Sequence, residues 1–162
     1  MVPTPSQTVG PFFGFAMPFA GDAEAVPPGT PGALRIEGQV FDGSGAAVPD
    51  AILEVFEGEQ FARCRTDEEG AFHFTVRRPA AVTDGEGIHA PHLNLLVFAR
   101  GLLRQLATRI YLPADPDALA RDAFLAHVEQ PRRHTLIARE TAAGLHFDVH
   151  LQGPDETVFV AI

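Results

Sequence analysis

The residues best able to do chemistry in this sequence are histidines and carboxylates in short patterns. In the first pattern, His146, Asp148 and His150 alternate with apolar residues over 145–152. On a strand, alternate side chains share a face and lie about 6.6 Å apart, close enough for two imidazoles and a carboxylate to bind one metal ion. Any half-buried strand also needs a polar outer face. A metal site and an ordinary outer face therefore both stay open.

A second pattern contains His89, His92 and Arg100. A proline separates the two histidines, and no Cys, Asp or Glu stands beside them at ligand spacing. If a strand begins at His92, the side chains of His92 and Asn94 share a face, and we interpret them as a hydrogen-bonded core pair. Arg100 follows the apolar run 95–99, and a guanidinium in that place needs an anionic partner. Two interpretations stay open: an anchor for an acidic ligand, or an ion pair with a carboxylate of the chain.

Nucleophilic catalysis finds little support. Ser6 and Ser44 are the two serines, and neither stands in a Gly-x-Ser-x-Gly motif. Cys64 is the single cysteine and has no histidine beside it. One cysteine excludes both an intramolecular disulfide and a cysteine zinc cluster, and it suits a reducing compartment.

The elements that must position these residues are mostly strands. From Leu34 onward, apolar residues recur with period two between Gly, Pro and Asp clusters, which predicts an all-β sandwich or barrel. One short helix is expected where Asp115 can cap and Pro116 can take the first helical position, ending near Ala126. The expected strands are 34–41, 51–56, 71–76, 92–100, 106–112, 135–139, 145–152 and 157–162.

The first 33 residues differ in composition from the rest. They hold seven of the 14 prolines, four phenylalanines and no Arg. Polar disordered tails lack aromatic residues, so an extended, proline-rich segment with four Phe should pack on an apolar surface of its own domain or of another chain. We therefore predict an arm at 1–33 and a sandwich domain at 34–162.

Length and charge exclude several classes of protein. A chain of 162 residues is one domain with one core. Its net charge is −9, and all 12 basic residues are Arg, which disfavours nucleic acid as a partner. The first residues lack a basic and apolar leader, and no stretch approaches the ~18 apolar residues of a membrane helix. We expect a soluble, cytoplasmic protein that does not bind membranes.

Short motifs occur in a fixed order over nearly the whole chain, at 4–12, 38–43, 53–55, 66–72, 90–94, 98–101, 108–111, 129–131, and 152–153 with 156–159. In this order they resemble the intradiol ring-cleavage dioxygenases. The resemblance implies the β-sandwich of that family, with the arm docking on a partner chain. Within the family, the order of motifs is most similar to the alpha chains of two-chain enzymes that cleave 3,4-dihydroxybenzoate with O2 to 3-carboxy-cis,cis-muconate.

The resemblance also implies which chain carries the cofactor. The family holds Fe(III) between two Tyr and two His. Tyr111 is the single tyrosine here, and it stands in a motif where the family has no ligand. Val82 replaces one ligand Tyr, and Asn94 replaces the second His of the His-x-His pair. The resemblance therefore implies an iron-free alpha subunit, a beta subunit that ligates Fe(III), and a higher-order alpha-beta oligomer.

The substrate site is implied by the same resemblance. Gly10 and Pro11 match the segment that lines the aromatic-ring cavity of the family, and Arg100 matches an Arg directed at the substrate carboxylate. Many alpha chains have Tyr where Phe12 stands. His92 and Arg100 are eight residues apart, about 26 Å along a strand, so they cannot hold one small ligand. We therefore expect Arg100 to serve a pocket at the subunit interface.

Two other functions stay open at this point. The first is a non-enzymatic β-sandwich binding module whose arm docks on a partner. The second is a transthyretin-like hydrolase of the hydroxyisourate type, which should end in Tyr-Arg-Gly-Ser. Residues 159–162 read Phe-Val-Ala-Ile instead.

Overall fold

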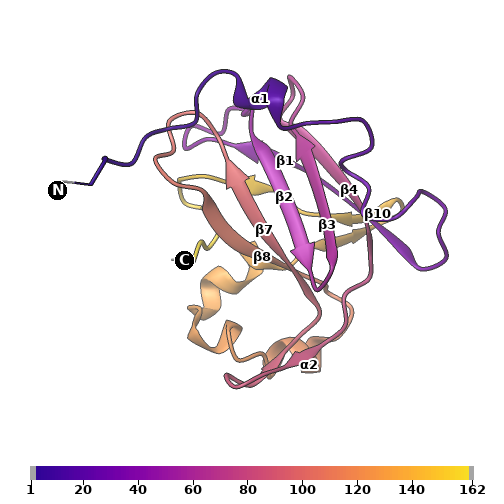
Figure 1. The fold of residues 1–162 in the computed structure, drawn as a ribbon. Helices are drawn as coiled ribbons and strands as arrows, with labels where there is room; N and C mark the ends of the chain where they lie inside the picture. Colours follow the sequence, from indigo (N-terminus) through magenta and orange to yellow (C-terminus); the bar gives the residue numbers. More distant parts are fainter. Residues whose placement is uncertain (1–2, 161–162) are drawn as a thin grey trace.

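A computed structural model describes residues 3–160, and its strands form a two-layer sandwich (Figure 1). In one layer, β1 pairs with β4 on one side and with β10 and β11 on the other, and β9 pairs with β10. The other layer has the order β3-β2-β7-β8, and β5 pairs with β6 outside both layers. The strands are β1 (Ala33–Phe41), β2 (Ile52–Glu57), β3 (Gln60–Arg65), β4 (Ala71–Arg77), β5 (Val82–Thr83), β6 (Ile88–His89), β7 (His92–Phe98), β8 (Leu106–Tyr111), β9 (Arg139–Thr141), β10 (Gly144–His146) and β11 (Val149–His150).

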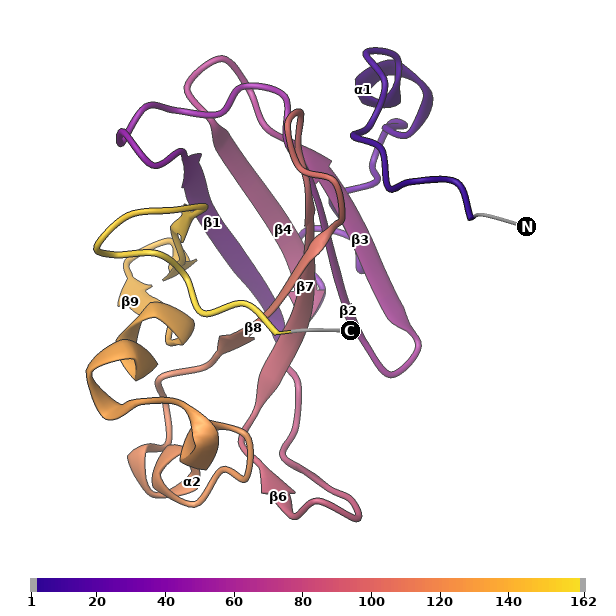
Figure 2. The same ribbon diagram turned by 90° about the vertical axis from the view of Figure 1, so that its left-hand side faces the viewer.

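In the described part of the chain, four short helices accompany the strands. They are α1 (Phe13–Ala16), α2 (Pro116–Ala120), and the 3-10 helices η1 (Leu125–His127) and η2 (Gln130–Leu136). Figure 2 shows α1 and α2 at opposite ends of the sandwich. No helix within residues 3–160 has the length and apolar character needed to cross a membrane.

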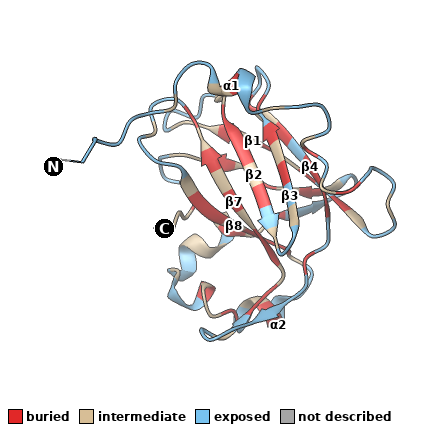
Figure 3. Ribbon diagram, in the orientation of Figure 1, coloured by how far each residue is buried: buried red, intermediate tan, exposed pale blue. Residues whose placement is uncertain are grey.

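The main core lies between the two layers, and buried residues alternate with less buried ones along strands such as β1 and β7 (Figure 3). Ile36 and Phe74 come from one layer, Leu53 and Leu95 from the other, and all four are fully buried. A second cluster, around Tyr111, joins the far end of β8 to α2, η1 and η2. The predicted all-β sandwich is confirmed.

Several predicted elements differ from the structure. The stretch predicted as a strand at 135–139 is mostly not one, because η2 runs from Gln130 through Leu136 and β9 begins at Arg139. The helix at Pro116 is capped by Asp115 as predicted, but it ends at Ala120 instead of Ala126. From 157 to 160, an isolated bridge between Val160 and Ala107 replaces the predicted strand, and 161–162 lie outside the described residues.

The strand predicted at 145–152 is interrupted at Phe147. There the backbone crosses close to β1, and a Cβ on Gly38 would collide with the carbonyl group of Phe147. The side chain of Asp148 accepts a hydrogen bond from the N–H of Gln39 at 3.0 Å. In the gap between β10 and β11, the Asp148 carboxylate thus accepts the β1 N–H that a backbone carbonyl would accept in a continuous strand. The alternation of buried and half-buried residues from Leu145 to His150 is as predicted.

The arm is neither wholly extended nor uniformly exposed. Residues 13–16 form α1, which the sequence did not predict. Residues 22–26 pack on their own domain, since the backbone of Asp22 bonds Arg63 of β3 and the backbone of Ala23 bonds Thr75 of β4. Residues 3–12 are mostly exposed (Figure 3).

Candidate functional site

The three residues predicted to bind substrate come to the same end of the molecule. Arg100 and Gly101 lie in the turn after β7, and the hydroxyl of Thr8 accepts a hydrogen bond from the N–H of Gly101 at 3.0 Å. This bond ties the arm to the turn, two residues before Gly10 and one residue after Arg100. Beside it runs a shallow groove lined by Gln7, Val9, Phe98, Ala99, Leu102, Leu103, Arg104 and Gln105.

Arg100 is exposed and paired within its own chain. The strand β7 ends at Phe98, so Arg100 lies beyond it, and its side chain is 67% exposed. Its Nε forms an ion pair with Asp50, whose side chain is 18% exposed. Exposed pairs of this kind contribute little to stability, about 0–1 kcal/mol. The isolated chain thus already supplies Arg100 with an anionic partner. The role of Arg100 in binding substrate stays a prediction.

Gly10 has no structural reason to be glycine within this chain. Its φ lies outside the left-handed region, and a Cβ built on it would meet no atom within 4 Å. Both Gly10 and Pro11 are exposed. The arm motif is therefore free to contact another molecule.

Of the positions where the resemblance implied iron ligands, His92 begins β7, at the end of the strand opposite to Arg100. His92 is buried, and its Nδ1 lies 2.8 Å from the carbonyl oxygen of Ala90, so the predicted bond to Asn94 is wrong. Burial lowers the pKa of His92, which keeps the ring neutral at neutral pH. Val82 is exposed on the small β5–β6 hairpin. Within 3–160, no group of three His, Cys, Asp or Glu residues has the arrangement of a metal site.

A buried polar network fills the space next to His92. The carboxylate of Asp122 accepts hydrogen bonds from the hydroxyl of Tyr111 and from the N–H groups of Ala90 and Leu125, at 2.7 to 3.0 Å. Arg109 donates to the Tyr111 hydroxyl at 3.1 Å and stacks on a phenylalanine ring. Burial, more than any neighbouring charge, raises the pKa of Tyr111, so its phenolate form is strongly disfavoured.

This network was missed at the sequence level. Tyr111 and Asp122 are 11 residues apart, on β8 and in the loop after α2. The one indication in the sequence was the alternation of Arg109 and Tyr111 on β8. If both side chains are buried there, each needs a hydrogen-bonding partner. The sequence offers many aspartates that could serve, and no spacing rule selects Asp122.

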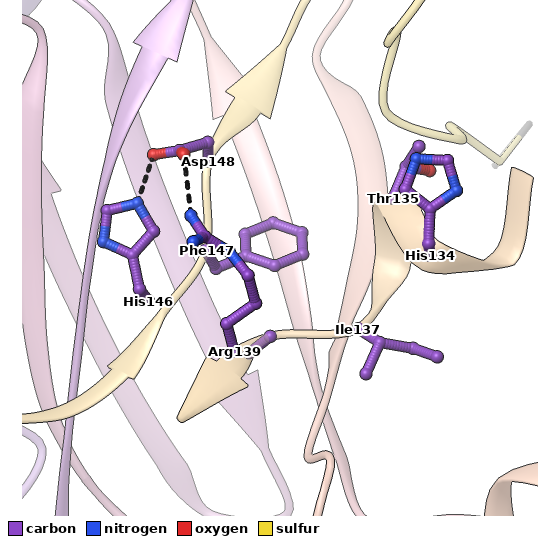
Figure 4. A pocket seen from close by; sticks show the side chains of 8 residues that line it. His134, Thr135, Ile137, Arg139, His146, Phe147 and Asp148 are labelled. Carbon is purple, nitrogen blue, oxygen red and sulfur yellow. Dashed lines mark hydrogen bonds and ion pairs between the residues drawn. The ribbon is translucent and has the colours of Figure 1, made fainter. Parts of the chain in front are cut away.

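The polar face of 145–152 makes ordinary contacts with its own sheet (Figure 4). His146 Nε2 lies 2.8 Å from one oxygen of Asp148, and Arg139 lies 3.5 Å from the other. His150 instead stacks on the ring of Phe41, with 5.1 Å between centroids. His146, Asp148 and His150 therefore do not converge on one point, and the alternative of an outer sheet face agrees with the structure.

Two curated proteins are similar to nearly the whole chain. The protocatechuate 3,4-dioxygenase alpha chains of Burkholderia cepacia and Pseudomonas putida are each 34% identical to it. The matches cover 96% of this chain and 95% and 94% of those relatives. The chain belongs to the family of protocatechuate 3,4-dioxygenase alpha chains. No protein-family model matches the sequence.

Solved structures place this alpha-chain family member in the intradiol dioxygenase fold. The dioxygenase domain of a Streptomyces fusion protein superposes with a TM-score of 0.62 at 22% identity, covering 94% of this chain and 99% of that one. Catechol 1,2-dioxygenase from Acinetobacter gives 0.59 at 19% identity. That match covers 78% of this chain and 55% of the enzyme, so the chain spans about half its length. The resemblance inferred from the motifs is confirmed, and nothing in these similarities supports a transthyretin-like hydrolase.

Proposed function

We propose that this chain is the alpha subunit of a protocatechuate 3,4-dioxygenase that is active in complex with an iron-bearing beta subunit. The reaction is cleavage of 3,4-dihydroxybenzoate by O2 to 3-carboxy-cis,cis-muconate. The observation that carries the proposal is 34% identity to named alpha chains over 96% of this chain. A cytoplasmic location and a higher-order alpha-beta oligomer belong to the same proposal.

The residues of this chain do not fit the Fe(III) cofactor of the family. The Nδ1 of His92 faces the carbonyl oxygen of Ala90, and Asn94 and Val82 lack a side chain suited to ferric iron. Tyr111 bonds Arg109 and Asp122, and its raised pKa opposes the phenolate that a ligand would require. We therefore assign the iron to the beta subunit and no catalytic residue to this chain.

Gly10, Pro11 and Arg100 are the proposed contribution of this chain to substrate binding. The Thr8–Gly101 hydrogen bond brings the arm motif beside the turn that carries Arg100. The open space around Gly10 leaves room for close approach of a ring to the backbone. The guanidinium of Arg100 can bind a carboxylate with two parallel hydrogen bonds, for which it must exchange or share its contact with Asp50.

The arm is the proposed surface for the beta subunit. Phe12 and Phe15 are each 75% exposed, and Phe19 is 62% exposed. Three large apolar side chains this close in sequence are costly to leave in water and mark an interaction surface. Phe12 lacks the hydroxyl of the usual Tyr, so it offers the partner an apolar contact alone.

Deleting residues 1–12 should weaken both assembly and activity. The truncated chain loses Thr8, Gly10, Pro11 and Phe12, and so loses the tie to the turn after β7 as well as the proposed pocket wall. Residues 22–26 remain bonded to β3 and β4, so the sandwich itself should stay folded. The measurement is co-purification with the beta subunit and ring cleavage of 3,4-dihydroxybenzoate.

The full-length chain and the beta subunit alone are the controls. The beta subunit should be fully active when the full-length chain is present. Without this chain it should retain a small fraction of that activity. If the truncated chain co-purifies and supports normal turnover, the arm has no role in the site. If the beta subunit alone is fully active, the proposed function of this chain is wrong.

A further inference from the structure

The short helix α1 has few stabilising contacts of its own. It has four residues, far below the ~12 at which isolated helices become marginally stable. Gly14 is its single buried residue, and its last turn contains no basic side chain to bind the free carbonyl groups. Figure 1 shows α1 against the ends of β2 and β3. Something outside the helix must therefore hold it in place.

The side chain of Arg65, the last residue of β3, contacts the arm. Its Nη1 donates to the carbonyl oxygen of Gly14 at 3.3 Å, and its guanidinium lies 5.7 Å from the ring centroid of Phe15. A Cβ on Gly14 would lie 3.3 Å from the Nε of Arg65, so the missing side chain is what allows this close packing. A cation at the carbonyl end of a helix is also favoured electrostatically.

Arg63 makes a second contact, two residues along the same strand. Its Nη1 donates to the carbonyl oxygen of Met17 at 3.0 Å. Its Nε and Nη2 both bond Glu54 of β2, at 2.8 and 2.6 Å, and the pair is largely buried. Because Glu54 fixes the orientation of the guanidinium, Arg63 offers the arm a donor that is already in position.

We propose that Arg63 and Arg65 are positioning residues that hold α1 on β3 and thereby set the place of the arm motif at Gly10 and Pro11. The two guanidinium groups bind the carbonyl oxygens of Gly14, within α1, and Met17, directly after it. These two attachment points, three residues apart, fix both the position of α1 along β3 and the rotation of the helix about its axis. That rotation keeps Phe12 and Phe15 outward, where both are 75% exposed. The effect on substrate rests on the proposed function, whereas the placement of α1 does not.

The direct test is amide hydrogen exchange of the full-length chain carrying Arg65→Gln. The N–H groups of Phe15, Ala16 and Met17 are bonded within α1, so their exchange reports how firmly the helix is held. We expect exchange about 10-fold faster in Arg65→Gln, because a charged donor to the arm is lost. Arg65 is exposed, so the variant should fold. Arg65→Lys, which keeps the charge, should recover part of the protection.

Arg35→Gln is the matched control. Arg35 also lies on a strand, carries the same charge and pairs with Glu37, but β1 belongs to the other sheet. The control should leave exchange in α1 unchanged. Equal exchange of α1 in Arg65→Gln and in the unmodified chain would overturn the proposal.

The same variant in the complex with the beta subunit separates this proposal from the proposed function. If both hold, KM for 3,4-dihydroxybenzoate rises several-fold in Arg65→Gln, while kcat and the iron content of the beta subunit stay unchanged. Faster exchange in α1 with an unchanged KM would support the role of Arg65 in placing α1. It would contradict the proposed contact of Gly10 and Pro11 with substrate.

Discussion

Arg100→Ala is expected to lower kcat/KM for 3,4-dihydroxybenzoate by about 10- to 150-fold, mainly through KM. A charge-assisted contact between Arg and a carboxylate contributes roughly 1.5–3 kcal/mol, and about 1.4 kcal/mol corresponds to one decade. Catechol has no carboxylate, so its turnover by the same complex should change far less. The measurement is steady-state kinetics of both substrates on the assembled variant.

Asp50→Asn is the variant that isolates the ion pair. It removes the charged partner of Arg100 and leaves the guanidinium in place. If Arg100 binds substrate, Asp50→Asn should keep KM for 3,4-dihydroxybenzoate near its normal value or lower it. If the pair is a framework contact, Asp50→Asn and Arg100→Ala should impair assembly alike. An equal loss for catechol and 3,4-dihydroxybenzoate in Arg100→Ala would remove Arg100 from the site.

Asp122→Ala is expected to reduce the free energy of unfolding by about 3–5 kcal/mol, the cost of removing one partner from a buried charged network. The side chain is fully enclosed, and its loss leaves two backbone N–H groups and the Tyr111 hydroxyl without their acceptor. Tyr111→Phe removes a single hydroxyl and should cost about 1 kcal/mol. Denaturant unfolding followed by circular dichroism measures both.

Asp115→Ala serves as the comparison for Asp122→Ala. Asp115 is also an Asp that accepts a backbone N–H, but it is exposed at the start of α2, where loss of a cap costs about 1 kcal/mol. If Asp122→Ala destabilises the chain no more than Asp115→Ala, the network does not hold the loops against β8. The polar network beside His92 would then have no stabilising role.

The strands with large residues facing the core could be predicted from the sequence. In β4 and β7 large apolar residues occupy every second position, as they do in β1 apart from Gly38, and burial of one sheet face imposes that period. The strand β3 escaped detection because its inward residues, Ala62 and Cys64, are small, while Phe61, Arg63 and Arg65 point outward. Its identity as a strand depends on pairing with β2, which no local pattern shows.

The incorrect boundaries have side-chain causes. The carboxylate of Asp122 accepts the N–H of Leu125, which starts η1 separately and ends the helix that apolar periodicity alone would extend. At 135–139, Leu136 and Ala138 alternate as in a strand, but a 3-10 helix with Pro131 in its first turn extends through Leu136. In both places a specific hydrogen bond or proline overrides the hydrophobic pattern.

The candidate site could not be predicted from residue pattern alone. Gly10 and Pro11 were singled out by resemblance to a family, since an exposed Gly-Pro pair has no distinctive spacing. Their link to the turn after β7 is a hydrogen bond between residues 93 positions apart. The expectation of an iron-free chain, in contrast, comes from the resemblance read on the sequence, because Val82, Asn94 and a single tyrosine cannot supply the ligand set that the resemblance implies.

Metal analysis of the separated subunits tests the central claim most directly. The alpha-beta complex is purified, its two chains are separated under conditions that retain bound iron, and iron is measured in each fraction. We predict iron in the beta fraction at close to one atom per chain, and little in this chain, together with no ring cleavage by this chain alone. Near-stoichiometric iron in this chain, with the visible absorption of iron bound to tyrosinate, would contradict the account.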